Sequence, residues 1–379
     1  MSDETQRSDS TASGPDMQRS DVGSEYTVVD TDCHFMEEMD DVAEYMDEPW
    51  RTRLLEGGEK ATMMFFPEGS GDRFKWGKIN RDHSGPTKYP HGGMHIDEIR
   101  PGMDHLNVDK TIQLSHLLLL TDKLSADDAR ISEFARGYVR YAKDTFLDPD
   151  DGIYTMAPVP YEDAEASLEI LEMVEDDPGF VGAYLITPGS QLPLGNRKYE
   201  PIYERCEEIG MPCVFHSAGA DIDSDNFPGY ETMLATHTLG FLEHNMEQLT
   251  SLIVQGIPEK YPDLDIAFME CGVTWLASYL TRLDNNYLKR PEEAPHLERK
   301  PSEYAKEMYF GTQPFESNAD PELLEGVFNV MDGANSFMYS SDWPHWDYDR
   351  PSMVTDLPFL SEEEKAKVLG ENAEEVFGI

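Results

Sequence analysis

The sequence predicts an α/β fold, a (β/α)8 TIM barrel with an insertion between its first two strands. Short and mostly apolar runs recur along the 379 residues, and helix-like patterns fill most of the gaps between them. Continuous apolar runs are typical of parallel strands that are buried on both faces. Such strands alternating with helices form either a closed barrel or an open, doubly wound sheet, and a count of eight runs favours the barrel.

The predicted elements alternate from Thr27 to Phe377. The strands are predicted at Thr27–Asp30, Thr111–Ser115, Ile153–Ala157, Val181–Ile186, Cys213–Phe215, Asp265–Met269, Met308–Phe310 and Phe337–Ser340. The helices are predicted at Ser125–Thr145, Asp163–Val174, Tyr199–Glu208, Met246–Tyr261, Trp275–Tyr287, Pro321–Met331 and Ser361–Phe377. The first helix opens with Ser-Ala-Asp-Asp, a sequence typical of a helix N-terminus, and Gly370 is expected to break the last one.

Two segments do not follow this alternation. Residues 1–25 are rich in Ser, Asp, Glu and Gly without periodicity, which predicts a disordered acidic tail before a barrel at 26–379. Residues 35–110 separate the first two strands, and a structureless loop of that length is improbable inside a compact domain. We interpret 35–110 as an inserted lid or subdomain at the barrel mouth, with some short helix at Val42–Leu55.

The chain is strongly acidic, and this composition indicates the solvent to which the protein is adapted rather than its function. The 75 Asp and Glu against 30 Lys and Arg give a net charge of −45, spread over the whole sequence. Nucleic acids and anionic membranes bind basic surfaces, so we expect neither as a partner. Acidic residues spread evenly along the chain indicate a halophilic origin. At 1 M salt the Debye length is about 3 Å, so the salt screens the repulsion among these negative side chains.

Other features predict a cytoplasmic location. No apolar run approaches the ~20 residues of a membrane span, and the first 25 residues contain no apolar core of a signal peptide. The four cysteines show no CxxC spacing and no density typical of a disulfide scaffold, as expected in a reducing compartment.

Acidic residues and histidines follow several of the predicted strands, where a barrel of this type places its chemistry. Asp32 and His34 are two residues apart, so on an extended segment both side chains face one pocket. His216 ends the fifth strand and Asp342 follows the eighth, which gives a mixed site with up to four ligands. Such a set suits one divalent metal ion, zinc first and manganese second, with a position open for water. Taken singly, Asp32 could cap a turn and His216 could be a core histidine.

The segments around these residues resemble a known family. They read Val-Val-Asp-Thr-Asp-Cys-His-Phe, Val-Phe-His-Ser, Phe-Met-Glu-Cys-Gly-Val-Thr-Trp-Leu, Tyr-Ser-Ser-Asp-Trp-Pro-His and Lys-Val-Leu-Gly-Glu-Asn-Ala. The combination resembles the amidohydrolase superfamily, specifically the branch of aminocarboxymuconate-semialdehyde decarboxylase and related aromatic-acid decarboxylases. The resemblance implies a distorted barrel of the metal-dependent hydrolase type with one catalytic metal ion. It assigns Asp32, His34, His216 and Asp342 to the metal, and Asp342 also to proton transfer.

One departure from the branch affects the expected reaction. Its decarboxylases typically carry a catalytic histidine after strand six, whereas this chain has Glu270. Glu270 could be a base, a metal ligand or a partner that orients a ligand histidine, and it could donate a proton only if burial raised its pKa. We therefore expect a hydrolase for a small carbonyl or carboxylate compound, with Asp342 or Glu270 moving the proton. The alternatives are a non-oxidative decarboxylase of an aromatic or muconate-like acid and a catalytically silent binding protein.

Four further residues are weaker candidates for substrate binding: His345, His244, Arg197 and His116. His345 follows Asp342 by three residues and could orient it, and Arg197 could clamp a substrate carboxylate, although an exposed arginine is the simpler interpretation. The resemblance makes a homodimer plausible. The sequence contains no GxSxG, no Walker loop and no GxGxxG after a strand, which removes support for a serine hydrolase, a P-loop NTPase or a Rossmann dehydrogenase.

Overall fold

The computed structural model describes residues 26–35, 37–57, 95–117, 129–218, 233–316, 320–345 and 347–379. The predicted tail at 1–25, residues 58–94 of the predicted insertion and the first residues of the helix predicted at Ser125–Thr145 lie outside this description. Within the described residues, no helix is long and apolar enough to cross a membrane.

Eight parallel strands form a barrel, and each strand pairs with the next one along the chain. They are β1 (Val29–Phe35), β2 (Lys110–Ser115), β3 (Ile153–Pro158), β4 (Phe180–Ile186), β5 (Cys213–His216), β6 (Ile266–Met269), β7 (Tyr309–Gly311) and β8 (Phe337–Met338). The end of β8 returns to β1, where Cys33 bridges to Trp343 and the amide of Thr31 donates to the carbonyl of Tyr339 at 3.2 Å. This consecutive order confirms the barrel and excludes the doubly wound sheet, in which the strand order reverses.

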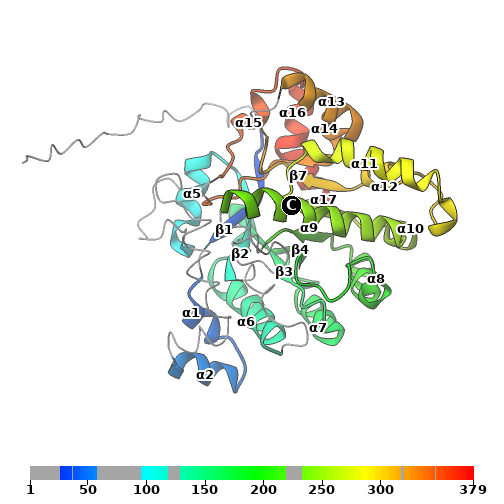
Figure 1. Ribbon diagram of the computed structural model, residues 1–379. Coiled ribbons are helices and arrows are strands. Elements are labelled where there is room, and N and C mark those ends of the chain that lie inside the picture. The colour runs from blue at the N-terminus through cyan, green and yellow to red at the C-terminus, as the bar shows by residue number, and fades with distance from the viewer. Residues whose placement is uncertain are drawn as a thin grey trace, which may run out of the picture.

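Helices surround the barrel in the order that the sequence predicts (Figure 1). The longer ones are α6 (Ala129–Thr145), α7 (Ala164–Val174), α8 (Glu200–Ile209), α9 (Met233–Val254), α11 (Thr274–Tyr287) and α13 (Pro321–Met331). Between β1 and β2 the described residues form α1 (Met39–Ala43), α2 (Trp50–Gly57) and α5 (Ile99–Leu106). The remaining short helices are α10 (Ile257–Lys260), α12 (Pro301–Ala305), α14 (Gly333–Ser336), α15 (Ser352–Thr355), α16 (Glu362–Ala366) and α17 (Asn372–Phe377).

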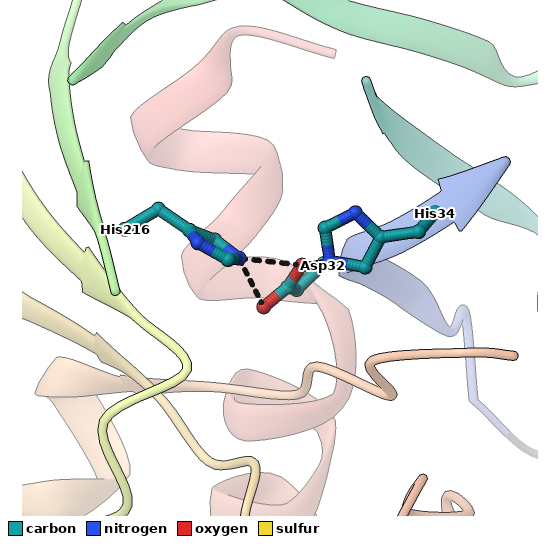
Figure 2. A group of neighbouring side chains, drawn as sticks. All are labelled: Asp32, His34 and His216. Atoms are coloured by element: carbon teal, nitrogen blue, oxygen red, sulfur yellow. Dashed lines mark hydrogen bonds and ion pairs between the residues drawn. The ribbon is translucent and has the colours of Figure 1, made fainter. Parts of the chain in front are cut away.

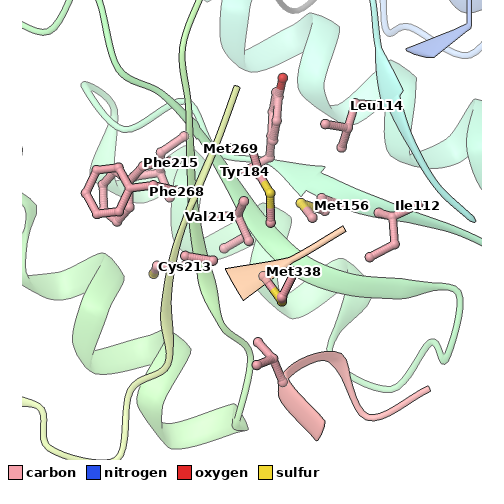
Figure 3. Close-up of a cluster of buried hydrophobic side chains, with 14 of the residues drawn as sticks. Ile112, Leu114, Met156, Tyr184, Cys213, Val214, Phe215, Phe268, Met269 and Met338 are labelled. Carbon is pink, nitrogen blue, oxygen red and sulfur yellow. The ribbon is translucent and has the colours of Figure 1, made fainter. Parts of the chain in front are cut away.

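The core has one layer inside the barrel and one between the strands and the helices. Because side chains alternate along a strand, Val214 of β5 faces inward while Phe215 faces the helices (Figure 3). The Phe215 ring stacks on that of Phe268 in β6, with ring centroids 5.2 Å apart, and lies 6.5 Å from Tyr203 of α8. Thioethers fill much of the interior, where Met269 accepts a hydrogen bond from the Thr31 hydroxyl at 3.6 Å.

Helix α9 begins at Met233, well before the position that the sequence predicts. The prediction of a helix at Met246–Tyr261 missed residues 233–245 of α9, where glycine, threonine and histidine give little helix propensity, and it joined the end of α9 to the separate helix α10. Contacts with the barrel compensate for that propensity. The backbone carbonyl of Phe241 accepts a hydrogen bond from the Ser217 hydroxyl at 3.4 Å. The side-chain amide of Asn245 donates to the backbone carbonyl of Glu270 at 3.5 Å. The first half of α9 therefore packs against the residues that follow β5 and β6.

The prediction that Gly370 breaks the last helix was also wrong. Helices α16 and α17 are joined by a π-helical turn at Lys367–Glu371, and the chain stays helical through the glycine. A Cβ atom at position 370 would lie 2.4 Å from the carbonyl oxygen of Thr27. The glycine therefore serves close packing of this helical segment against the residues that lead into β1.

We expect Gly370→Ala to lower the free energy of unfolding by about 1–3 kcal/mol, because the added methyl group collides with backbone. The matched control is Gly326→Ala in α13, where a Cβ atom would meet nothing within 4 Å. That control should raise stability by about 0.5–1 kcal/mol through helix propensity. Denaturant titration in molar KCl measures both values. A destabilisation by Gly326→Ala equal to that by Gly370→Ala would contradict the packing argument.

Candidate metal centre

Asp32, His34 and His216 converge in a buried cluster inside the barrel (Figure 2). Strand β1 continues to Phe35, beyond the predicted end, and therefore carries both Asp32 and His34. His216 ends β5, and its Nε2 lies 3.3 Å from each carboxylate oxygen of Asp32. The Nε2 of His34 lies 3.1 Å from Asp32 Oδ1. One ligand atom from each of the three residues lies within 4.8 Å of the others, which is a suitable spacing around a metal ion.

Asp342 joins this cluster from the loop after β8. Its Oδ1 lies 3.2 Å from His34 Nε2 and is hydrogen-bonded to His345 Nδ1. Its Oδ2 accepts a hydrogen bond of 3.3 Å from the side-chain amide of Gln313, a residue that follows β7. His345 Nε2 lies 3.4 Å from His116 Nδ1. The structure thus brings two of the weaker candidates, His345 and His116, next to the predicted ligands.

The backbone between β1 and β8 sets the positions of the two aspartates. The Asp342 amide donates a hydrogen bond of 2.7 Å to the Asp32 carbonyl. Below them, the buried carboxylate of Asp30 accepts hydrogen bonds from the Ser341 amide at 2.8 Å and the Ser341 hydroxyl at 2.5 Å. The amide of Asp32 donates to Asp30 Oδ1 at 3.3 Å. A β-bulge between Asp30 and Cys33 accompanies this arrangement, as is common beside active sites.

Sequence analysis missed both Asp30 and Gln313. Asp30 carries a usable signal, because it lies two residues before Asp32 on a predicted strand and so faces the same side. Gln313 carries none, since a glutamine after a short strand is as common on the surface as in a site. The contact with Asp342 depends on how the loops after the neighbouring strands β7 and β8 fold.

Glu270 faces the cluster from the end of β6. Its Oε2 lies 3.8 Å from His216 Nε2, and the side chain is buried. Both Glu270 and Asp342 have positive φ angles, 48° and 59°. A non-glycine residue held in this region costs about 1–3 kcal/mol, and such residues concentrate at functional sites. The strain here directs two carboxylates toward one group of imidazoles.

The electrostatics of the cluster favour a positive charge at its centre. Burial raises the pKa of Asp32, but the imidazoles of His216 and His34 outweigh it and hold this pKa well below its usual range. Burial lowers the pKa of His34, whereas hydrogen bonds to Asp32 and Asp342 raise it to about 10. Carboxylates this deeply buried need a cation or a protonated partner. Two imidazoles and two carboxylates in a buried group are the ligand types that zinc and manganese take, so these residues fit one divalent metal ion.

Two weaker candidates lie elsewhere. Arg197 is exposed and lines a surface recess with residues of α8 and with Lys260, so the structure does not bring it to the cluster, in agreement with the simpler interpretation. His244 is buried on the part of α9 that contacts the ends of β5 and β6.

Comparison with known proteins identifies the family. Residues 29–379 match the model of the amidohydrolase family, which is nearly the whole described chain. The chain belongs to this family. It is therefore an enzyme, a hydrolase or a carboxy-lyase, and its strand-end cluster occupies the face of the barrel where such enzymes carry their chemistry.

The amidohydrolase-family chain has curated relatives with a named reaction. It is 25% identical over 237 residues to the gamma-resorcylate decarboxylase of Rhizobium sp., which covers 60% of this chain and 70% of the relative. It is 25% identical over 262 residues to the gamma-resorcylate decarboxylase of Polaromonas sp., covering 66% of this chain and 78% of the relative.

Solved structures share the fold of this amidohydrolase-family chain. An amidohydrolase from Mycobacterium avium subsp. paratuberculosis superposes with a TM-score of 0.70 at 19% identity, covering 93% of this chain and 99% of the other. A dihydroxybenzoic acid decarboxylase from Polaromonas sp. superposes with a TM-score of 0.63 at 19% identity, covering 93% and 97%. That structure contains manganese and the inhibitor 2-nitroresorcinol. At these identities the likeness establishes the fold alone.

We expect the purified wild-type chain to hold about one zinc or manganese ion, and Asp32→Asn/His34→Ala to hold none, because the double variant lacks two of the ligands. Elemental analysis of protein purified in molar KCl measures this. His296→Ala is the control, since His296 is exposed, lies far from the strand-end cluster in sequence and structure, and is hydrogen-bonded to the Val254 carbonyl. Equal metal content in wild type and the double variant would place the ion elsewhere.

A second prediction concerns Asp30. Asp30→Ala leaves the Ser341 and Asp32 amides without their acceptor, which should lower the free energy of unfolding by about 1–3 kcal/mol. Because Ser341 precedes Asp342, we also expect metal affinity to fall about 10- to 100-fold. Asp30→Asn keeps one acceptor oxygen, so its stability and metal affinity should lie between those of the wild type and those of Asp30→Ala. Calorimetric metal titration of folded variants measures the effect, and an unchanged affinity in Asp30→Ala would refute the positioning role.

Proposed function

We propose that this chain catalyses the non-oxidative decarboxylation of a hydroxy-substituted aromatic acid at one divalent metal ion held by Asp32, His34, His216 and Asp342. The observation that carries the proposal is the buried cluster of imidazoles and carboxylates on a barrel whose four curated relatives are gamma-resorcylate decarboxylases. Zinc and manganese both suit the ligand set, and manganese is the ion in the related decarboxylase structures.

This proposal reverses the order in which the sequence ranked the two reactions. The hydrolase ranked first because Glu270 replaces the histidine typical of decarboxylases after strand six. The relatives favour the decarboxylase instead. They include 5-carboxyvanillate decarboxylase structures as well as the resorcylate enzymes, so the barrel accommodates several aromatic acids. We take the presence of Glu270 as a change in one acid–base group rather than a change in reaction class.

The reaction releases the substrate carboxylate as CO2 and consumes one proton. The bond between the ring carbon and the carboxylate carbon breaks, CO2 leaves, and a proton takes the place of the carboxylate on the ring. A bound divalent metal would supply Lewis acidity at oxygens of the substrate. The chain supplies two carboxyl groups for the proton, Asp342 from the end of β8 and Glu270 from the end of β6. His345 and Gln313 hold the two oxygens of Asp342 in fixed directions.

Hydrolysis is the second candidate, and Glu270 is the observation that favours it. A carboxylate 3.8 Å from a ligand imidazole is suitably placed to accept a proton from attacking water. The substrate would then be an ester, amide or lactone with a carbonyl at the cluster.

We expect the wild-type chain loaded with manganese or zinc to release CO2 from 2,6-dihydroxybenzoate or 5-carboxyvanillate. Chelation with EDTA should abolish the release and metal should restore it. Glu270→Gln, which keeps the size of the side chain, should lower kcat by about 10²–10⁴-fold with metal retained if Glu270 carries the proton. A smaller loss would assign the proton to Asp342. The measurement is CO2 release in molar KCl beside hydrolysis of esters and lactones.

The same assay separates the alternatives. Hydrolysis of an ester or lactone without CO2 release from either acid would establish the hydrolase. Metal binding with no turnover of any of these compounds would contradict the proposed substrate class for both reactions.

A further inference from the structure

Tyr184 on β4 is a buried tyrosine that the proposed reaction does not use. Its side chain is only 2% exposed, and in the part of the chain that the structure describes its hydroxyl has no hydrogen-bond partner. Other buried tyrosines of the barrel have one. Tyr203 donates to the Leu194 carbonyl at 2.6 Å, and Tyr339 donates to the Asp349 carbonyl at 3.0 Å. A buried hydroxyl without a partner costs free energy that phenylalanine would avoid.

The side chain of Tyr184 points from inside the barrel toward the metal centre. In the register of β4 and β5, Tyr184 pairs with Val214, two residues before His216. The rings of Tyr184 and His216 nevertheless lie 5.3 Å apart, so the tyrosine rises toward the carboxyl ends of the strands. Figure 3 shows its ring extending past the thioether of Met269, with the oxygen at the far end.

The carboxylates of the cluster act on the Tyr184 phenol. Burial, followed by the charges of Asp32 and Glu270, raises the pKa of Tyr184 well above its usual value. A phenol is in any case protonated at neutral pH, so the hydroxyl presents a hydrogen-bond donor. An acceptor oxygen on a ligand at the cluster would satisfy it.

We propose that Tyr184 is a substrate-binding residue, whose hydroxyl donates a hydrogen bond to an oxygen of the organic acid bound at the cluster. This inference rests on the proposed function, because it takes that site to bind an oxygen-rich ligand, and it names a determinant of specificity within it. A site built to donate a hydrogen bond discriminates against a ligand that lacks the acceptor. Tyr184 therefore favours acids with an acceptor oxygen directed at β4, such as a carboxylate or a phenolate oxygen.

The test compares Tyr184→Phe with the wild type, both loaded with manganese. The probes are 2-nitroresorcinol, which does not turn over, and acetohydroxamate, a small chelator with two oxygens. Tyr184→Phe should bind at least one of the probes about 3- to 10-fold more weakly, which corresponds to one lost hydrogen bond. Its metal content should be unchanged, and its stability should stay equal or rise because the buried hydroxyl is gone.

Tyr203→Phe is the matched control, since it removes a buried tyrosine hydroxyl that bonds within the protein. It should lose stability and keep its probe affinity. This pattern, opposite to that of Tyr184→Phe, distinguishes ligand binding from a structural role.

Two results would overturn the role of Tyr184. One is equal affinity of wild type and Tyr184→Phe for both probes at equal metal content. The other is a metal-loaded wild type that binds neither probe. Failure of the proposed reaction is recognised separately, as absence of CO2 release from hydroxybenzoates by a wild type whose affinity for acetohydroxamate still depends on Tyr184.

Discussion

The hydrogen bond from the Asp342 amide to the Asp32 carbonyl is the contact on which the site depends. It lies where the end of β8 meets β1, the last step in closing the barrel. Strand β8 itself is only two residues long, so the loop after it completes the closure through Tyr339 and Trp343. The same closure brings the carboxylates of Asp32 and Asp342 to one histidine, His34. The contacts that close the barrel thus also bring the proposed metal ligands together.

This arrangement carries a cost in stability. Asp30 stays buried beneath the cluster with a pKa raised to about 7, chiefly by burial, and only its hydrogen bonds to Ser341 and Asp32 oppose that shift. Glu270 and Asp342 occupy strained backbone. Removal of one partner from such a group leaves an uncompensated buried charge, which is strongly destabilising. A divalent cation at the centre would offset the repulsion among these carboxylates, so we expect metal binding to raise folding stability.

Much of the fold can be predicted from local sequence patterns, because strands that are buried on both faces are continuous apolar runs and can be recognised without knowing their neighbours. All eight strands lie within a few residues of their predicted positions, and α13 matches its prediction at both ends. The residues at strand ends could be predicted for the same reason, since Asp32, His34 and His216 are adjacent to those runs. What could not be predicted depends on contacts between distant segments. The first half of α9 is stabilised by the ends of β5 and β6, and Gln313 meets Asp342 only where the loops after the neighbouring strands β7 and β8 pack together.

The residues that the sequence predicts least well are those expected to choose the substrate. One barrel fold serves many different reactions through its loops, so the fold does not by itself decide which substrate binds. Helix α9, which contacts the ends of β5 and β6, also reaches the loop after β8. Its His237 ring packs 4.5 Å from that of Phe241, and His237 Nε2 lies 3.5 Å from the Asp347 carboxylate in that loop. This contact ties α9 to the loop that carries Asp342. A change in α9 is therefore expected to shift Asp342 as well, which would couple the residues over the strand ends to the geometry of the proposed metal ligands.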